Sequence, residues 1–148
     1  MKQLTIFIFL MVFMTAPGMI PAFSETTETH TGQLTLTIEG FENTNGTAKI
    51  ALVNSKENYS GGEPFKGYNL GITGNRVVKT LVLPYGEYAV KVFHDENGSG
   101  ELEKGVFGIP IEAYGFSNDA RGTLGPPEYE KAAFKLDSPK KELVIHIK

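Results

Sequence analysis

Short runs of alternating apolar and polar residues recur along most of the chain. In the run at residues 33–39, Leu34, Leu36 and Ile38 share one face, while the threonines between them share the other. A period of two is typical of a β-strand that buries one face, and no segment shows a convincing helical period. The runs predict six strands, at residues 33–39, 47–53, 77–83, 87–93, 132–136 and 143–147, with a seventh near 68–72.

The residues between these runs predict how the strands connect. Asn45 and Gly46 favour a tight reversal after the first run, because both tolerate positive φ. The segment from Leu83 to Val92 turns at a proline and a glycine and then sends alternate side chains into the core. It is similar to a segment of transthyretin-like sandwich domains. We therefore predict an all-β antiparallel sandwich of about seven strands, transthyretin-like or immunoglobulin-like, with one long ordered loop.

Two connections are longer than such strands need. Residues 54–75 are rich in glycine and contain three aromatic side chains. Residues 95–131 hold aromatic and branched apolar side chains among many glycines and prolines. A long aperiodic connection is usually functional or disordered, and aromatic rings that seek burial argue against disorder. We expect an ordered excursion that packs over one end of the sandwich.

The beginning of the chain predicts export. Lys2 supplies a positive charge, residues 4–12 are apolar except for Thr5, and Ala22-Phe23-Ser24 resembles a cleavage site. The alternative, a membrane anchor, is disfavoured because the apolar run is short and prolines follow it. We predict a signal peptide at residues 1–24, a disordered lead-in at 25–31 and a single β-sandwich domain at 32–148 of a periplasmic or secreted protein.

Composition narrows the classes of partner. Removal of residues 1–24 takes one of 14 basic residues and none of the 17 acidic ones, which leaves a net charge of −4 on 124 residues. This balance gives no reason to expect nucleic acid or an anionic membrane as a partner. The chain has no cysteine, so its stability must come from packing, with a bound metal as one further source. No later segment is apolar enough to cross a membrane.

An acidic loop after the run at residues 87–93 carries the most specific chemistry. Oxygen-bearing side chains alternate at Asp95, Asn97 and Ser99, and a glycine follows them. This is the spacing of the first positions of a calcium-binding loop, in which a backbone carbonyl and a water-mediated carboxylate come next. The loop therefore predicts a calcium site at Asp95, Asn97, Ser99, Glu101 and Glu103.

The acidic loop also departs from the calcium pattern. Val106 stands where a bidentate glutamate is expected, and a strand rather than a helix precedes the loop. Glu112 or Asp119 would have to complete the coordination shell. The alternative is a solvated hairpin turn at Asn97-Gly98 whose acidic side chains only aid solubility. The sequence leaves both interpretations open.

A second candidate site lies further along the same connection. Aromatic side chains presented by a glycine-rich loop are typical of a surface that contacts peptide or sugar, and an arginine there can clamp a carboxylate. The predicted ligand-binding residues are Tyr114, Phe116, Asn118 and Arg121. The alternatives are an internal pair of Arg121 with Asp119 or Glu112, and a satellite hydrophobic cluster beneath the loop.

His94 raises the question of catalysis. It ends a predicted strand on the core-facing parity and is followed by Asp95 and Glu96, so it could act as a general base. No activated nucleophile stands at a recognisable spacing from it, and a histidine at a strand end more often bonds to backbone. No histidine spacing suggests a zinc triad.

An ordered series of short motifs makes the chain recognisable. The motifs are His94-Asp95-Glu96-Asn97-Gly98-Ser99-Gly100-Glu101-Leu102, Phe107-Gly108-Ile109-Pro110, Tyr114-Gly115-Phe116-Ser117-Asn118, Ala120-Arg121-Gly122, Gly125-Pro126-Pro127 and Ala132-Ala133-Phe134. Together they resemble the exported bacterial family known as domain of unknown function 2141, over roughly residues 32–148. The resemblance implies a secreted or periplasmic β-sandwich and brings no established binding or catalytic residues.

We therefore expect an exported, non-catalytic β-sandwich that binds a protein, peptide or glycan at its loop end, with calcium ordering the acidic loop. One alternative is a hydrolase that uses His94 with Asp95 or Glu96. Another is a structural component of the cell envelope.

Overall fold

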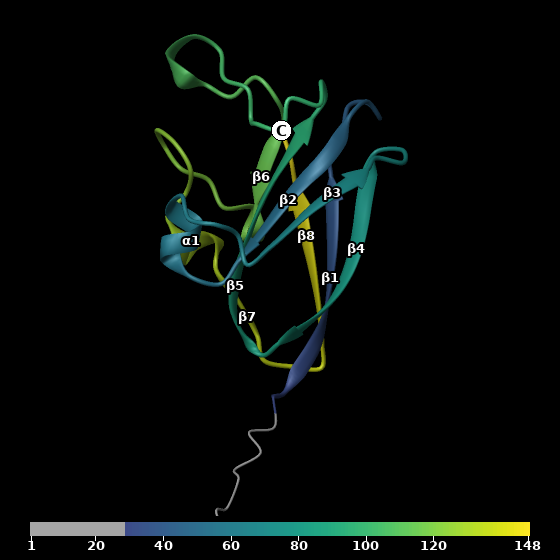
Figure 1. The fold of residues 1–148 in the computed structure, drawn as a ribbon, viewed down its shortest axis with the longest axis vertical. Helices are drawn as coiled ribbons and strands as arrows, with labels where there is room; N and C mark the ends of the chain where they lie inside the picture. Colours follow the sequence, from purple (N-terminus) through teal and green to yellow (C-terminus); the bar gives the residue numbers. More distant parts are fainter. Residues whose placement is uncertain (1–28) are drawn as a thin grey trace, which may run out of the picture.

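The computed structural model describes residues 29–148, so the expected signal peptide and residues 25–28 of the expected lead-in lie outside the described part. The strands are β1 (Thr31–Glu39), β2 (Thr47–Val53), β3 (Lys66–Gly71), β4 (Arg76–Pro84), β5 (Gly86–Asp95), β6 (Tyr114–Phe116), β7 (Phe134–Leu136) and β8 (Lys140–His146). The helical segments are α1 (Lys56–Ser60), α2 (Tyr129–Ala132) and two single 3₁₀ turns, η1 (Val106–Gly108) and η2 (Ser117–Asp119). The prediction of an all-β sandwich is confirmed (Figure 1).

Most predicted strands are present with small shifts at their ends. β2 has the predicted bounds, and the predicted seventh strand is β3. β1 begins at Thr31, one residue before the expected start of the domain. β6 was not predicted, because three residues are too few to show a period, and Ala132 ends α2 instead of starting β7. The short α1 and α2 were likewise not predicted.

The strands form two sheets. One has the order β4-β1-β8, and the other has the order β3-β2-β5-β6 with β7 also paired to β5. The expectation that both sheets are antiparallel is wrong for one pair, because β1 and β8 run parallel, with Leu36 opposite Leu143. The first and last strands of the domain are therefore neighbours, which a pattern of alternating residues cannot reveal.

The reversal at Asn45-Gly46 joins strands of two different sheets. β1 belongs to the three-stranded sheet and β2 to the five-stranded one, so this connection carries the chain from one sheet to the other. Gly46 has φ +63°, and a Cβ there would lie 1.8 Å from the carbonyl oxygen of Asp95. A glycine is required because this corner presses against the end of β5.

Side chains from both sheets fill the space between them. The predicted inward set is confirmed, since Leu34, Leu36 and Ile38 are fully buried, and Tyr88 and Val90 of β5 lie in the same cluster. A second buried cluster lies on the other face of the five-stranded sheet, around α1, α2 and β6. Its members are Val53, Tyr59, Ala89, Phe116, Ala120, Tyr129 and Ala132. The five-stranded sheet is therefore partly covered on its outer face as well.

The connection from β5 to β7, together with α1 from the connection between β2 and β3, forms this outer cover (Figure 1). Ser117 fixes it to the sheet where β6 ends and before β7 begins. Its buried hydroxyl accepts a hydrogen bond from the Val90 amide at 2.8 Å and donates one to the Ala132 carbonyl at 2.5 Å. No helix among residues 29–148 is both long and apolar enough to cross a membrane.

Candidate functional site

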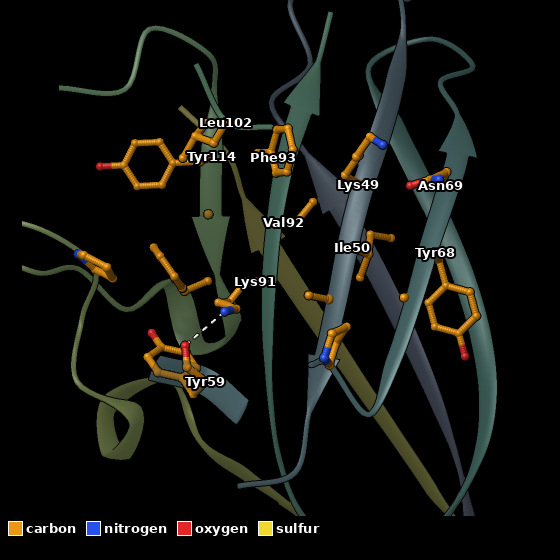
Figure 2. A pocket seen from close by; sticks show the side chains of 16 residues that line it. Lys49, Ile50, Tyr59, Tyr68, Asn69, Lys91, Val92, Phe93, Leu102 and Tyr114 are labelled. Carbon is orange, nitrogen blue, oxygen red and sulfur yellow. Dashed lines mark hydrogen bonds between the residues drawn. The ribbon is translucent and has the colours of Figure 1, made fainter. Parts of the chain in front are cut away.

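A hollow of about 660 Å³ lies on the outer face of the five-stranded sheet. Two rows of paired residues run across the sheet beneath it. The first row is Asn69, Lys49, Phe93 and Tyr114, on β3, β2, β5 and β6 in turn. The second row is Gly67, Ala51, Lys91 and Phe116 on the same strands. We call this hollow the groove (Figure 2).

The groove is deep where the second row has small residues. Gly67 and Ala51 present little or no side chain, whereas Phe93 and Tyr114 present rings in the neighbouring row. Leu102 from the acidic loop also lines the groove, as does Pro126 from residues 120–128, which we call the second loop. Loops on two sides therefore extend the walls of a site whose floor is regular sheet.

Gly115 allows β6 to take its place at the edge of the sheet. A Cβ on Gly115 would lie 3.0 Å from both the His146 carbonyl oxygen and a side-chain carbon of Ile145. Backbone amides and carbonyls of Tyr114 and Lys148 also bond to each other across this edge. The close approach to the C-terminal strand holds Tyr114 and Phe116 on the groove side of β6.

Lys91 is the cation at the centre of the groove. Its ammonium donates a hydrogen bond to the Tyr59 carbonyl at 3.0 Å and lies 5.4 Å from the centroid of the Tyr59 ring (Figure 2). Burial lowers the pKa of Lys91, because the charged form is partly removed from water. The ion pairs within residues 29–148 do not include it.

Lys49 connects the groove to the acidic loop. It is paired with Phe93 across β2 and β5, and its ammonium lies 3.5 Å from Oδ2 of Asp95. Asp95 is almost completely buried, and its carboxylate holds the Lys49 ammonium by this ion pair. Lys49 thus contacts the predicted calcium loop, which itself contributes Leu102 to the groove.

The acidic loop is folded by hydrogen bonds between its own residues. The Gly100 amide donates to Oδ2 of Asp95 at 3.0 Å, and the Ser99 amide donates to Oδ1 of Asn97 at 2.9 Å. The Asn97 side-chain amide donates to Oε1 of Glu103 at 2.8 Å, and the Ser99 hydroxyl donates to the Glu101 carbonyl. The five predicted metal ligands are therefore brought together in one short loop.

Three observations bear on whether this loop fits a cation. Oδ1 of Asp95 is buried and has no hydrogen-bond partner in the protein, which is costly for a carboxylate oxygen. Glu112, one of the carboxylates expected to complete the shell, is instead occupied by the amides of Glu96 and Glu103. Residues 29–148 contain no group of three or more His, Cys, Asp and Glu residues placed to hold a metal ion. Side-chain amide, hydroxyl and carbonyl oxygens would have to supply most ligands.

Asp119, the other expected donor, is engaged elsewhere. Its two oxygens accept from the His146 amide at 2.8 Å and face the His146 ring at 2.7 Å. Burial tends to raise the pKa of Asp119, but the hydrogen bonds from His146 outweigh it and hold the pKa below its usual value.

His94 lies in the interior, as its parity predicted. The side chain is fully buried, its Nε2 lies 2.7 Å from the Asn45 carbonyl oxygen, and its ring meets Phe41 edge to face. Its Nδ1 lies 3.6 Å from a Glu96 oxygen. Neither the groove nor the hollow between the loops is lined by His94. This geometry does not favour a hydrolase that uses His94.

The four residues predicted to bind a ligand divide into two pairs. Tyr114 and Phe116 line the groove. Arg121 donates to the carbonyls of Tyr114 at 3.3 Å and His146 at 2.9 Å, instead of pairing with Asp119 or Glu112 at hydrogen-bond distance. The side-chain amide of Asn118 donates to two carbonyls in the segment around α2. Arg121 therefore binds the excursion to β6 and β8, whereas Asn118 joins two parts of the excursion to each other.

Sequence reasoning missed Lys49, Lys91 and Phe93 as groove residues. All three lie on the strand face opposite the core, and a charged or aromatic residue there signals only an outward position. The fact that they meet depends on β2, β5 and β6 being neighbours.

A smaller hollow of about 570 Å³ lies between the two loops beside the groove. It is lined by exposed apolar side chains such as Phe107, which is 94% exposed, and Leu124, which is fully exposed. Phe107 also has φ +65°, a conformation unusual for a bulky residue. This hollow and the groove share Leu102, Tyr114, Phe116 and Pro126.

Comparison with known proteins identifies the family to which the chain belongs. No curated protein matches the chain, and no solved structure matches it. A family model described as an uncharacterized protein conserved in bacteria (DUF2141) matches residues 36–144, and the chain therefore belongs to this family, as its motifs predicted.

Proposed function

We propose that this protein is an exported, non-catalytic binding module whose ligand lies in the groove on the outer face of the five-stranded sheet. The observation that carries the proposal is a hollow of about 660 Å³ in which sheet, α1 and both loops converge. Sites for small molecules typically have volumes of about 300–1,000 Å³, apolar walls and a few polar groups. The groove has this composition, with aromatic walls and two lysines.

The location of the groove refines the expectation of binding at the loop end. The ligand would lie on the rings of Phe93 and Tyr114, with the loops as flanking walls. A floor of paired strands supports a preformed site, because side chains on sheet are held more rigidly than those on loops.

A bulky side chain in the floor tests this proposal. Ala51→Trp fills the deep part of the groove from an outward-facing position, so the core is not disturbed. We expect the neutral apolar dye N-phenyl-1-naphthylamine to bind the wild-type protein and to lose at least about tenfold in affinity with the variant. Thr80→Trp, on the exposed face of β4, is the matched control and should bind as the wild type does.

The same titration can refute the proposal. Fluorescence of the dye measures binding, and circular dichroism checks that both tryptophan variants fold. Equal dye affinity of folded Ala51→Trp and wild type, or no binding to either, would remove the groove as the binding site.

We propose in addition that calcium orders the acidic loop. Support comes from the unpartnered, buried Oδ1 of Asp95 at the first position of the loop. Asp95, Asn97, Ser99 and Glu103 would hold the ion with the carbonyl of Glu101, and calcium would supply the partner that Oδ1 of Asp95 lacks, beside the Lys49 ammonium at Oδ2. The ligand set is poor in carboxylates, so we expect weak binding of the kind seen in extracellular modules, with a dissociation constant of about 1 mM.

Thermal unfolding tests the calcium proposal. At ~10 mM calcium and a dissociation constant of ~1 mM, the native state gains about 1.4 kcal/mol, which raises the melting temperature by about 5–6 °C for this length of chain. Asp95→Asn should abolish the shift, whereas Asp137→Asn, an exposed control, should retain it. An unchanged melting temperature of the wild type in calcium would contradict the proposal, and magnesium at the same concentration controls for ionic strength.

Export is supported by the sequence of residues 1–24 alone. We expect protein recovered from the periplasm or medium of a bacterial host to begin at Glu25, as intact mass would show. An intact mass that retains residues 1–24 would contradict cleavage.

A further inference from the structure

We infer that the groove takes an anionic amphiphile of small-molecule size, whose apolar body lies on the rings of Phe93 and Tyr114 and whose single anionic group binds Lys91. This inference rests on the proposed function, since it names the class of ligand for the same groove. It follows from the charges that line the groove and from the one cation there that lacks a counter-ion.

The groove is basic on an acidic protein. The chain carries 17 acidic and 14 basic residues, yet the side chains that line the groove include two lysines and no Asp or Glu. A neutral or cationic ligand would leave the Lys91 ammonium without an opposite charge. An anion fits the sign of the charge that the groove presents.

Lys91 is the lysine that is free to bind the anion. It is partly buried, and its hydrogen-bond partner is the neutral carbonyl of Tyr59, supplemented by the face of the Tyr59 ring. A partly desolvated ammonium is stabilised most by an opposite charge, which its surroundings within residues 29–148 do not provide. Lys49 by contrast already faces the buried Asp95 carboxylate at 3.5 Å.

The positions of the two rows orient the ligand. Lys91 lies in the second row beside Ala51 and Gly67, where the floor is deepest, and Phe93 lies in the first row on the same strand. An anionic group beside Lys91 therefore leaves the body of the ligand over Phe93 and Tyr114. Leu102 and Pro126 close the apolar side.

The number of free cations limits the ligand to one anionic group. A polyanion such as nucleic acid or a polyuronate needs a row of basic residues along its length. The groove offers one lysine without an acidic partner, and its volume suits a small molecule. Carboxylate, sulfate and phosphate head groups all satisfy this chemistry.

Two dyes with the same body test the inference. N-phenyl-1-naphthylamine is neutral, and 1-anilinonaphthalene-8-sulfonate adds one sulfonate to the same ring system. We expect the sulfonate dye to bind the wild-type protein at least about tenfold more tightly, because hydrogen bonds between charged groups are the strong ones. Lys91→Met should abolish this difference, and Lys91→Arg should retain most of it. Lys140→Met, an exposed lysine of β8, is the control and should leave the difference unchanged.

Binding to the exposed loop tips must be separated from binding in the groove. Leu124→Ser removes an apolar side chain at the tip and should leave both affinities unchanged, whereas Ala51→Trp should weaken both dyes. If Leu124→Ser removes the preference for the sulfonate dye and Ala51→Trp does not, the inference is overturned.

A head-group series on the wild-type protein keeps the inference testable if Lys91→Met does not fold. Decanoate, decyl sulfate and decyl phosphate should displace the sulfonate dye, and their order identifies the preferred anion. Decanol and decyltrimethylammonium should compete at least about tenfold less well.

The outcomes distinguish this inference from the proposed function. Equal affinity for the two dyes, or equal competition by decanol and the anions, overturns the inference and leaves the groove as a binding site. Failure of both dyes to bind overturns both.

Discussion

Ser117→Ala is the most direct test of how the groove is built. β6 pairs with β5 at residues 91–93 and β7 pairs with it at residues 86–88, so the Val90 amide faces the gap between the two short strands. The Ser117 hydroxyl fills this gap with one bond to Val90 and one to the Ala132 carbonyl. Alanine at position 117 removes both bonds and places no new group there.

The expected cost follows from burial. Ser117 is fully buried, so its removal leaves the Val90 amide without a partner and without water. An unsatisfied buried donor costs about 1–3 kcal/mol, and we take about 2 kcal/mol as the expected loss of unfolding free energy. With an unfolding entropy of ~2.1 cal/mol/K per residue over roughly 120 residues, the melting temperature should fall by about 8 °C.

Thermal or urea unfolding measures this loss, and amide hydrogen exchange locates it. Ser138→Ala is the matched control, because its hydroxyl donates to the Lys140 carbonyl in an exposed bond, and it should change stability by less than about 0.5 kcal/mol. The Val90 amide should exchange faster in Ser117→Ala than in the wild type. If the two alanine variants melt together and Val90 stays protected, Ser117 does not anchor the excursion.

Two further predictions concern the corner between the sheets and the edge of β8. Gly46→Ala should cost at least about 2 kcal/mol, because the new Cβ meets the Asp95 carbonyl at positive φ, whereas Gly74→Ala has open space and should cost only about 1 kcal/mol. Equal costs in urea unfolding would show that the close approach is unimportant. Hydrogen bonds from His146 lower the pKa of Asp119 in the folded state. The ionised carboxylate therefore stabilises the fold fully above the pKa of an unfolded aspartate, about 4. This stabilisation is lost as the pH falls through the lower pKa of the folded state. The stability difference between wild type and Asp119→Asn should therefore be full near pH 7 and shrink steadily from about pH 5 to pH 2; a difference independent of pH would contradict the assignment.

The sequence predicted the strands well because each buries one face. In β1 and β2, alternate side chains enter the core, and the period of two is visible without knowledge of the fold. β6 has only three residues, and its position depends on contacts with β5 and the end of β8. Such a strand is specified by tertiary packing, which local periodicity does not record.

The helices show a similar limit. Ser55 caps α1 by accepting a hydrogen bond from the Asn58 amide, a signal that was present in the sequence. The helix that follows has five residues, too few to show a period of 3.6. α2 has four residues and no side-chain cap, so it carries even less local signal.

The candidate site was predictable only in part. Tyr114 and Phe116 were predicted because aromatic side chains presented by a glycine-rich loop are typical of a binding surface. Lys49 and Lys91 were not, because alternation gives each residue a side of its strand and gives no information on which strands are neighbours. Arg121 was predicted to be important, but its partners are the backbone carbonyls of Tyr114 and His146 instead of a carboxylate, which residue types and spacing could not identify.

The parallel pairing of β1 with β8 places the earliest and latest strands of the domain next to each other. During folding, β1 can pair with β4 on one edge, but its other edge can form backbone hydrogen bonds only after β8, the last strand of the domain, is available. Contacts between distant parts of a chain form slowly, because a large loop must close first. A chain whose β8 segment is not yet available would therefore keep one edge of β1 open, and the three-stranded sheet would be completed only when β8 joins it.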